Sequence, residues 1–319
     1  MIKANLLHLG TNMWREESVT ELNFDEPTWR EITAAMPAAG FNMLVIDLGE
    51  GVVYPSHPEL AVKGSWLPEK VRGEVARLKK LGLEAIPKLN FSTTHDAWLG
   101  PYERMVSTPE YYKVCTDLVR DAAEIFGKPR FFHLGFDEEG VRHQEMMPYM
   151  VLRQGELWWH DFLLLAKETE KSGARPWIWA DKYWTEPGEF LERMPKSVLQ
   201  SVWYYDKSFD VAELKTHEQE ELRKERRRTV NWKRVQSFID LDKAGFDQVP
   251  CGSNWACDEN FGNLVSFCEK NLSLERKLGY LMAPWAMTVP GKKDKSMKAL
   301  DLAAAAFRGT ESKNGGSDS

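Results

Sequence analysis

Short runs of apolar residues alternate along the chain with longer segments whose apolar residues recur at helical spacing. The runs that predict strands are ANLLHLG (4–10), NMLVIDLG (42–49), EAIPKLNF (84–91), RFFHLGFD (130–137), PWIWAD (176–181), VLQSVWYYD (198–206), FDQVPCGSNW (246–255) and GYLMAPWAM (279–287). The segments that predict helices are 28–38, 67–81, 109–126, 148–172, 186–194, 229–244, 259–272 and 297–308. In the second of these, Val71, Val75 and Leu78 repeat at the 3.6-residue period of an amphipathic helix.

This alternation of strands and helices predicts an α/β fold, a single-domain (β/α)8 TIM barrel of parallel strands. An open doubly wound sheet is the alternative, but it would need a glycine-rich phosphate loop that LHLGTNMW (7–14) does not offer. We assign residues 1–309 to a catalytic barrel and the polar residues 310–319 to a disordered C-terminal tail. The charged run KTHEQEELRKERRR (215–228) predicts a solvated helix or an excursion over the barrel.

Composition narrows the classes of partner. The chain has 319 residues, 43% of them hydrophobic, and a net charge of -6, which argues against nucleic acid and anionic membranes as partners. It contains no apolar run of about 18 residues that could span a membrane. Its four cysteines lack the spacing of a zinc site or disulfide framework and predict free thiols. The start MIKANLLHLG does not resemble a signal peptide, so the chain as given is expected to be cytoplasmic; a periplasmic or secreted protein would have lost its targeting segment.

Polar and aromatic residues gather where the predicted strands end. In a barrel these ends share one face, on which active sites are built. The gathered residues are Asn12, Trp14, Asp47, Glu50, Asn90, His95, Asp96, Trp98, Asp181, Trp184, Trp203, Tyr204, Tyr205, Asp206, Asn254, Trp255 and Trp285. Tryptophan is abundant, with 13 in the chain, and its flat ring can stack on sugars. We expect Trp203, Trp255 and Trp285 to contact a ligand, whereas Trp158 and Trp159 should pack in the core.

The fourth predicted strand carries the sharpest signal, because FFHLGFDEEG (131–140) ends in three consecutive acids. Strand alternation would place His133 and Asp137 on the inward face, and a bulge at the strand end could turn Glu138 toward the mouth. Two neighbouring carboxylates repel, so one should keep a raised pKa and serve as a proton donor, as glycosidic bond cleavage requires. An exposed acidic turn is the alternative interpretation. Glu139 is expected to be exposed or structural.

The segment HLGFDE (133–138) resembles the H-x-G-G-D-E signature of glycoside hydrolase family 20, the β-N-acetylhexosaminidases. The upstream segment IPKLNFSTTH (86–95) is similar to the I-P-E-x-D-x-P-G-H segment on that family's preceding strand. The resemblance implies a retaining, substrate-assisted exo-β-N-acetylhexosaminidase-like enzyme acting on an oligosaccharide or glycoconjugate. It implies no metal and no organic cofactor.

The same resemblance assigns roles to residues of the motif. Glu138 would be the general acid and base, and Asp137 would orient the 2-acetamido group whose carbonyl attacks the anomeric carbon. Tyr205 or Tyr204 would assist that carbonyl. His95 and His133 would support the acids. The remaining candidate sugar contacts are Asn90, Asp181, Trp203, Asn254, Trp255 and Trp285.

The chain departs from the family pattern at several positions. Phe136 stands in place of the second glycine, Asn90 and Ser92-Thr93-Thr94 replace the acidic residue and P-G, and no arginine ends the first strand. Three alternatives stay open. They are a glycosidase with a protein nucleophile such as Asp181 or Asp47, a non-catalytic carbohydrate-binding barrel, and a metal-dependent hydrolase using His95, His133, Asp137 and Asp181.

Overall fold

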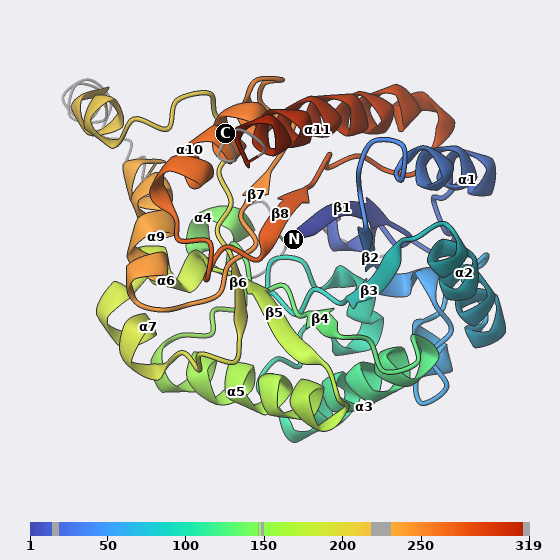
Figure 1. Ribbon diagram of the computed structural model, residues 1–319. Coiled ribbons are helices and arrows are strands. Elements are labelled where there is room, and N and C mark those ends of the chain that lie inside the picture. The colour runs from blue at the N-terminus through green and yellow to red at the C-terminus, as the bar shows by residue number, and fades with distance from the viewer. Residues whose placement is uncertain (15–18, 146, 148–149, 218–230, 315–319) are drawn as a thin grey trace.

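The computed structural model describes residues 1–14, 19–145, 147, 150–217 and 231–314 (Figure 1). Parallel strands form one 8-stranded sheet in the order β6-β5-β4-β3-β2-β1-β8-β7. Isolated bridges, Gln200 to Gln248 and Trp203 to Cys251, join the two ends of this order and close the ring. The strands are β1 Ile2–His8, β2 Met43–Asp47, β3 Glu84–Lys88, β4 Phe131–His133, β5 Arg175–Trp179, β6 Leu199–Ser201, β7 Cys251–Gly252 and β8 Gly279–Met282. The predicted (β/α)8 barrel is confirmed.

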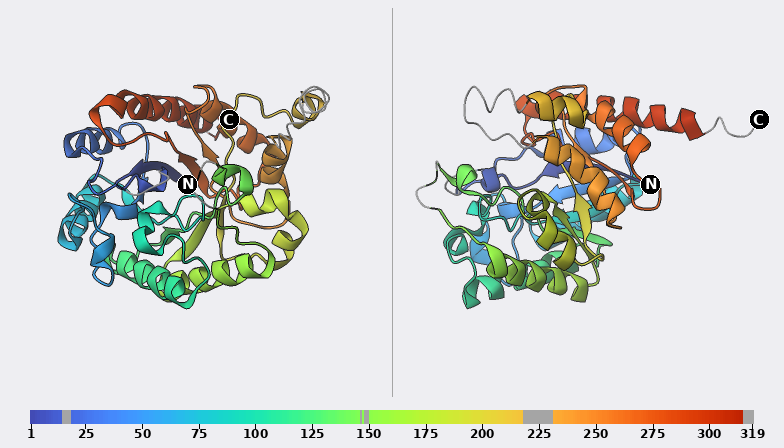
Figure 2. Two further views of the ribbon diagram at one scale, coloured as in Figure 1. Left: turned by 180° about the vertical axis from the view of Figure 1, so that it is seen from behind. Right: turned by 90° about the vertical axis from the view of Figure 1, so that its left-hand side faces the viewer.

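Helices surround the strands on the outside of the ring (Figure 1). The long helices are α1 Glu26–Ala35, α2 Pro68–Lys80, α3 Pro109–Ile125, α5 Gly155–Lys171, α7 Pro187–Arg193, α9 Asn231–Lys243, α10 Asn260–Asn271 and α11 Lys293–Asn314. Short helical segments decorate the loops: η1 Asn12–Trp14, η2 Gly49–Gly51, η3 Pro58–Leu60, η4 Ala97–Tyr102, α4 Val141–Gln144, α6 Asp181–Thr185 and η5 Pro290–Lys292. In the side view of Figure 2 the chain begins at one end of the barrel, and α4, coloured green, lies at the other end.

Local sequence signals explain where several helices begin and end. Asp25 accepts a hydrogen bond of 2.8 Å from Thr28 N at the start of α1, and Thr108 accepts one of 3.3 Å from Tyr111 N at the start of α3. A proline follows in the first turn of each helix, where its missing N–H has no helical partner to lose. Helix α2 ends before Gly82, whose φ of 80° is the left-handed conformation common after a helix.

The predicted elements and the observed ones differ mainly in length. Most strands end earlier than their apolar runs, and β7 has only two residues. The described start of α5 is Gly155, where the sequence predicted a helix from residue 148. Helix α11 continues to Asn314, past residue 310, where the sequence places the start of the tail. Residues 315–319 and most of the charged run 215–228 lie outside the described residues.

Burial confirms several sequence expectations about packing. Trp158 and Trp159 are almost fully enclosed, and all four cysteines are free. None of the helices in the described part of the chain is both long enough and apolar enough to cross a membrane. The buried apolar residues form one core between strands and helices, and polar residues collect inside the barrel and at its mouth.

Candidate active site

The chain leaves β4 through a turn of left-handed residues. The strand ends at His133, and φ is then 77° at Gly135, 67° at Phe136 and 58° at Glu138. The predicted strand alternation through residue 137 is therefore wrong, because the backbone stops being extended after His133. A turn does re-aim Glu138, as the bulge argument expected, and it brings Glu138 and Asp137 together at the mouth.

Glycine is required at the start of this turn. A Cβ on Gly135 would lie 2.1 Å from Asn90 Oδ1, and its φ already disfavours other residues. Phe136, which stands where the family signature has glycine, keeps a left-handed backbone that glycine adopts more readily. Its buried ring packs at 5.6 Å from the ring of Trp158 and 5.4 Å from that of Phe162.

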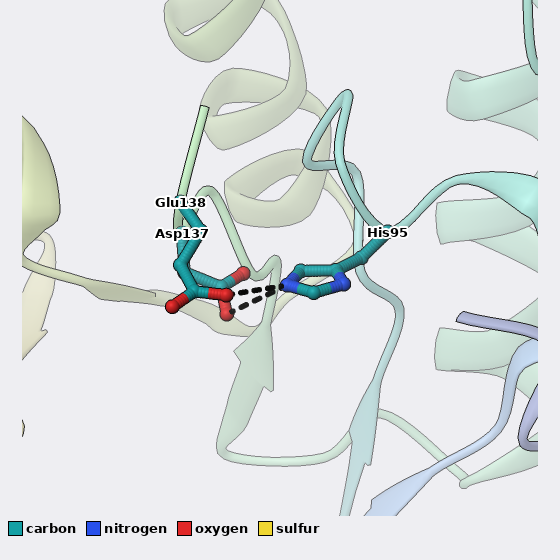
Figure 3. A group of neighbouring side chains, drawn as sticks. All are labelled: His95, Asp137 and Glu138. Carbon is teal, nitrogen blue, oxygen red and sulfur yellow. Dashed lines mark hydrogen bonds and ion pairs between the residues drawn. The ribbon is translucent and has the colours of Figure 1, made fainter. Parts of the chain in front are cut away.

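His95 bridges the two carboxylates (Figure 3). Its Nε2 lies 3.2 Å from Glu138 Oε2 and 3.6 Å from Asp137 Oδ2, and its Nδ1 lies 3.0 Å from the carbonyl oxygen of Met13. Burial alone would lower the pKa of His95, but the charge of Asp137 and the hydrogen bond to Glu138 outweigh it and raise the pKa to about 9. At neutral pH His95 is therefore an imidazolium, with one N–H for Met13 and one for the acids.

The pKa of Glu138 moves in the direction opposite to the sequence expectation. Its partial burial favours the neutral acid, but the hydrogen bond and charge of His95 dominate and lower the pKa. His143 and Arg234 contribute in the same direction, and His143 Nε2 lies 3.5 Å from Glu138 Oε1. In the ligand-free protein Glu138 is therefore a carboxylate, and the proton shared by the pair resides on His95.

Beside the two acids, at the end of β5, Asp181 is a carboxyl with a strongly raised pKa. Its enclosed position and the nearby charge of Asp137 raise the pKa. Oδ2 accepts a 3.1 Å hydrogen bond from Glu138 N, and Oδ1 accepts a 2.6 Å bond from Trp203 Nε1. Asp181 thus fixes the main chain of Glu138 and the indole ring of Trp203, which lines the cavity.

Residues that depart from the family's upstream segment hold the two acids in place. Asn90 Nδ2 donates to Asp137 Oδ1 at 2.9 Å, and the Ser92 hydroxyl donates to the carbonyl oxygen of Asp137. The Thr94 hydroxyl donates to the carbonyl oxygen of Glu138 at 2.7 Å. The substituted polar side chains therefore make a specific scaffold for the turn after β4.

A buried ion pair that the sequence did not indicate lies behind this scaffold. Arg153 pairs with Glu139 and also donates to the carbonyl oxygen of Phe91 at 2.8 Å. Glu139 accepts from Thr93 N at 2.9 Å and from Trp158 Nε1 at 2.7 Å. Glu139 is thus structural rather than exposed. Arg153 lies far from any predicted strand end, so no strand-end rule could have found it.

A cavity of about 450 Å³ opens in front of the acids, within the size range of small-ligand sites. Its lining residues are Met13, Trp14, His95, Asp137, Glu138, Trp179, Trp203, Tyr205, Trp255, Trp285, Ala286, Met287, Lys292 and Lys295. Trp203 stacks on Tyr205 with ring centroids 5.0 Å apart, and Trp255 is 64% exposed at the rim. Trp179, Lys292 and Lys295 were not among the predicted contacts.

Other predicted residues lie away from the cavity surface. His133 is fully buried, with its ring 4.5 Å from that of Trp179, and Gly135 N donates to its Nδ1 at 3.1 Å. Asn254 donates to the carbonyl oxygen of Lys295 at 3.0 Å, and Asn90 and Asp181 lie behind the acids. Tyr204 is buried with its ring 5.1 Å from that of Phe209, which leaves Tyr205 as the cavity tyrosine.

Neither alternative nucleophile lines the cavity. Asp47 is fully buried inside the barrel and pairs with Lys88. Burial raises the pKa of Asp47, although Lys88 opposes this effect. Both oxygens of Asp181 already accept hydrogen bonds. The geometry therefore favours Asp137 and Glu138 as the carboxylates that meet a ligand.

The same cluster includes atoms that could ligate a cation. Within the described ranges, a nitrogen of His95 and one oxygen each of Asp137 and Glu138 lie within 4.8 Å of one another. His133 and Asp181, which the metal-dependent alternative required, are not part of this group. Metal binding would require His95 to lose its Nε2 proton, because a protonated nitrogen has no lone pair to offer.

Solved structures share this barrel. The chain aligns with an exo-β-N-acetylglucosaminidase of glycoside hydrolase family 20 from Vibrio harveyi in complex with N-acetylglucosamine, at 14% identity and a TM-score of 0.62, covering 95% of this chain and 54% of that one. A chitobiase from Flavobacterium johnsoniae aligns at 18% identity and a TM-score of 0.59, covering 93% of this chain and 47% of that one. Dispersin B aligns at 15% identity and a TM-score of 0.55, covering 96% and 98%.

These likenesses establish the fold, and this chain spans about half the length of the Vibrio and Flavobacterium proteins. No protein-family model matches the sequence, and no curated protein matches it.

Proposed function

We propose that the protein is a retaining glycoside hydrolase that removes terminal β-linked N-acetylhexosamine from a glycan by substrate-assisted catalysis. The observation that carries this proposal is the His95–Asp137–Glu138 cluster at the edge of an aromatic cavity. The cluster lies at the carboxyl ends of the barrel strands, where barrel enzymes carry their active sites. The fold shared with family 20 enzymes and the resemblance of HLGFDE (133–138) to their signature support the same conclusion.

In this proposal the proton for the leaving group comes from the His95–Glu138 pair. The pair holds one proton below pH about 9, on His95 when the cavity contains water. A sugar that fills the cavity removes water from Glu138 and so disfavours its carboxylate form. The proton then moves across the 3.2 Å contact to Glu138, which donates it to the glycosidic oxygen.

Asp137 stays anionic in this scheme and faces the 2-acetamido group. It accepts the acetamido N–H and stabilises the positive charge that develops as the acetamido carbonyl oxygen attacks the anomeric carbon. Tyr205 lies on the cavity wall beside Trp203 and Trp285, where its hydroxyl can donate to that carbonyl. Water, activated by Glu138 acting as a base, then opens the cyclised intermediate with net retention.

The test is hydrolysis of aryl β-N-acetylglucosaminide, aryl β-N-acetylgalactosaminide and the matching 2-hydroxy glycosides by wild type, Glu138→Gln and Asp137→Asn. Turnover limited to the 2-acetamido sugars and reduced at least about 100-fold in Glu138→Gln is expected, since general acid–base catalysis contributes at least that much. Both substitutions are nearly isosteric, so circular dichroism should stay close to wild type. The melting temperature should fall, because each variant lacks one of the two carboxylates that stabilise the His95 imidazolium.

Other outcomes would redirect the proposal. Turnover of 2-hydroxy glycosides would place the nucleophile on the protein and overturn substrate assistance. Loss of turnover with a chelator, restored by a divalent metal, would favour the cation-binding use of His95, Asp137 and Glu138. Tight sugar binding without turnover, unchanged in Glu138→Gln, would favour a carbohydrate-binding barrel.

A further inference from the structure

Two lysines line the cavity and have no acidic partner in the described part of the chain. Lys292 ends η5, and Lys295 lies in the first turn of α11. No described carboxylate lies within 4 Å of either ammonium group. Their neighbours differ: Lys293 pairs with Glu31 at 2.7 Å and Lys298 with an aspartate at 2.5 Å. Among the lysines of η5 and the first turns of α11, the two that face the cavity are the ones without a described carboxylate partner.

The placement of this pair is electrostatically unfavourable without a ligand. Burial and the charge of Lys292 lower the pKa of Lys295, so the two ammonium groups act on each other. Both also lie near the N-terminal end of a long helix, where the helix dipole disfavours cations. An anion between the two groups would relieve this repulsion and gain charge-assisted hydrogen bonds.

The lysines face the acids across the mouth of the barrel. In the strand order, β8 is separated from β4 by three strands on either side, so the two strands are opposite each other in the ring. Asp137 and Glu138 follow β4, and the lysines follow β8. A sugar whose anomeric carbon lies at Glu138 would therefore direct the far edge of its ring toward the lysines.

The charges of the whole cavity support an anionic ligand. Its charged lining consists of Asp137, Glu138, His95, Lys292 and Lys295. The imidazolium of His95 neutralises part of the charge of the acids, and the lysines then leave the cavity net positive. A neutral sugar would leave that excess uncompensated.

We propose that the terminal sugar carries an anionic ester, a sulfate or a phosphate, at C3, C4 or C6, and that Lys292 and Lys295 bind this group. Asn254 is a positioning residue in this arrangement, because its 3.0 Å bond to the carbonyl oxygen of Lys295 fixes the start of α11. This inference rests on the proposed hydrolase function for the orientation of the sugar.

The test compares 4-nitrophenyl N-acetyl-β-glucosaminide with its 3-, 4- and 6-O-sulfates and its 6-O-phosphate. Wild type is expected to favour one of the esters, and the phosphate arm separates a sulfate site from a general phosphate site. In the double variant Lys292→Met/Lys295→Met the ratio of kcat/KM for that ester to kcat/KM for the unsubstituted substrate should fall about 10-fold. The matched control is Lys293→Met. Lys293 lies between the two lysines in sequence, pairs with Glu31 and does not line the cavity, so its substitution should leave the ratio unchanged.

Calorimetric binding of the free sulfated and unsulfated N-acetylglucosamines separates the two proposals. Tighter binding of the ester than of the unsubstituted sugar, lost in the double variant, supports the anion site whether or not turnover is seen. Hydrolysis of all substrates without preference for any ester, or a preference that survives in the double variant, overturns the anion site and leaves the hydrolase standing. Ester-selective, lysine-dependent binding without any turnover would overturn the hydrolase alone, and no sugar binding at all would overturn both.

Discussion

Replacing His95 by glutamine should remove a pH-dependent contribution to stability that can be calculated from the site. The imidazolium lies between two carboxylates, and its pKa rises from 6.5 to about 9. At about 1.4 kcal/mol for each tenfold change in proton affinity, this rise corresponds to about 3 kcal/mol of stability. Glutamine keeps a donor near Met13 and most of the volume, but it carries no proton that titrates.

The sign of the pH dependence follows from the raised pKa. A group that binds its proton more tightly when folded stabilises the protein fully below its unfolded pKa of 6.5, and this stabilisation is lost as pH rises through about 9. The difference in unfolding free energy between wild type and His95→Gln should therefore shrink by about 3 kcal/mol between pH 6.5 and pH 9.5. Urea unfolding at half-unit pH intervals, analysed for both proteins, measures this difference.

A neutral control is needed because other groups titrate in the same range. Leu274 is 79% exposed and uncharged, so the difference between wild type and Leu274→Ala should be flat across the same interval. A flat difference for His95→Gln as well would refute the assignment of the shared proton to His95. The proposed mechanism also predicts that wild-type kcat/KM falls as pH rises through about 9, where the pair loses its proton.

Three further variants probe the supports of the site. Gly135→Ala should lower the urea midpoint by the equivalent of about 2–3 kcal/mol and reduce turnover, because the added Cβ meets Asn90 at 2.1 Å in a strained backbone; an unchanged midpoint would contradict this. Arg153→Met should destabilise by about 3–5 kcal/mol in chemical unfolding, since Glu139 would remain buried without its partner, and adding Glu139→Gln should recover part of the loss. Trp255→Ala should raise KM with little change in kcat or melting temperature, because the ring is exposed at the cavity rim; a lower melting temperature would instead indicate a packing role.

Alternation of strands and helices sufficed to predict the barrel, because parallel strands buried on both faces leave long apolar runs between amphipathic helices. The ends of the strands could not be predicted in the same way. The apolar run 130–137 continues past His133, yet left-handed backbone at Gly135 and Phe136 ends the strand there. An apolar pattern does not distinguish an extended residue from a buried residue in a turn.

The candidate site was predictable where it depends on strand ends and a recognisable motif. His95, Asp137, Glu138, Trp203 and Tyr205 meet around one cavity for that reason. Residues that reach the site through tertiary packing gave no such signal. Two groups are examples: the cavity lysines of η5 and α11, and the Arg153–Glu139 pair. Their segments do not stand out in the sequence as ends of strands.

The prediction of a raised pKa was wrong for Glu138, because the structure places a cation beside it. Adjacent carboxylates predicted mutual repulsion and a raised pKa on one of them. In the structure a cation, His95, contacts both Asp137 and Glu138 and opposes that repulsion. The raised pKa falls instead on Asp181, because it is more enclosed and lies near the charge of Asp137.

The left-handed backbone of Glu138 has a consequence for the thermal stability of variants at this position. A φ of 58° costs a residue with a Cβ about 1–2 kcal/mol, and asparagine or glycine tolerates it better. The carboxylate also stabilises the His95 imidazolium, so replacing Glu138 gains from the backbone and loses from the ion pair. The balance depends on pH: above about pH 9, where His95 is neutral, only the backbone cost remains, and variants at this position become comparatively more stable.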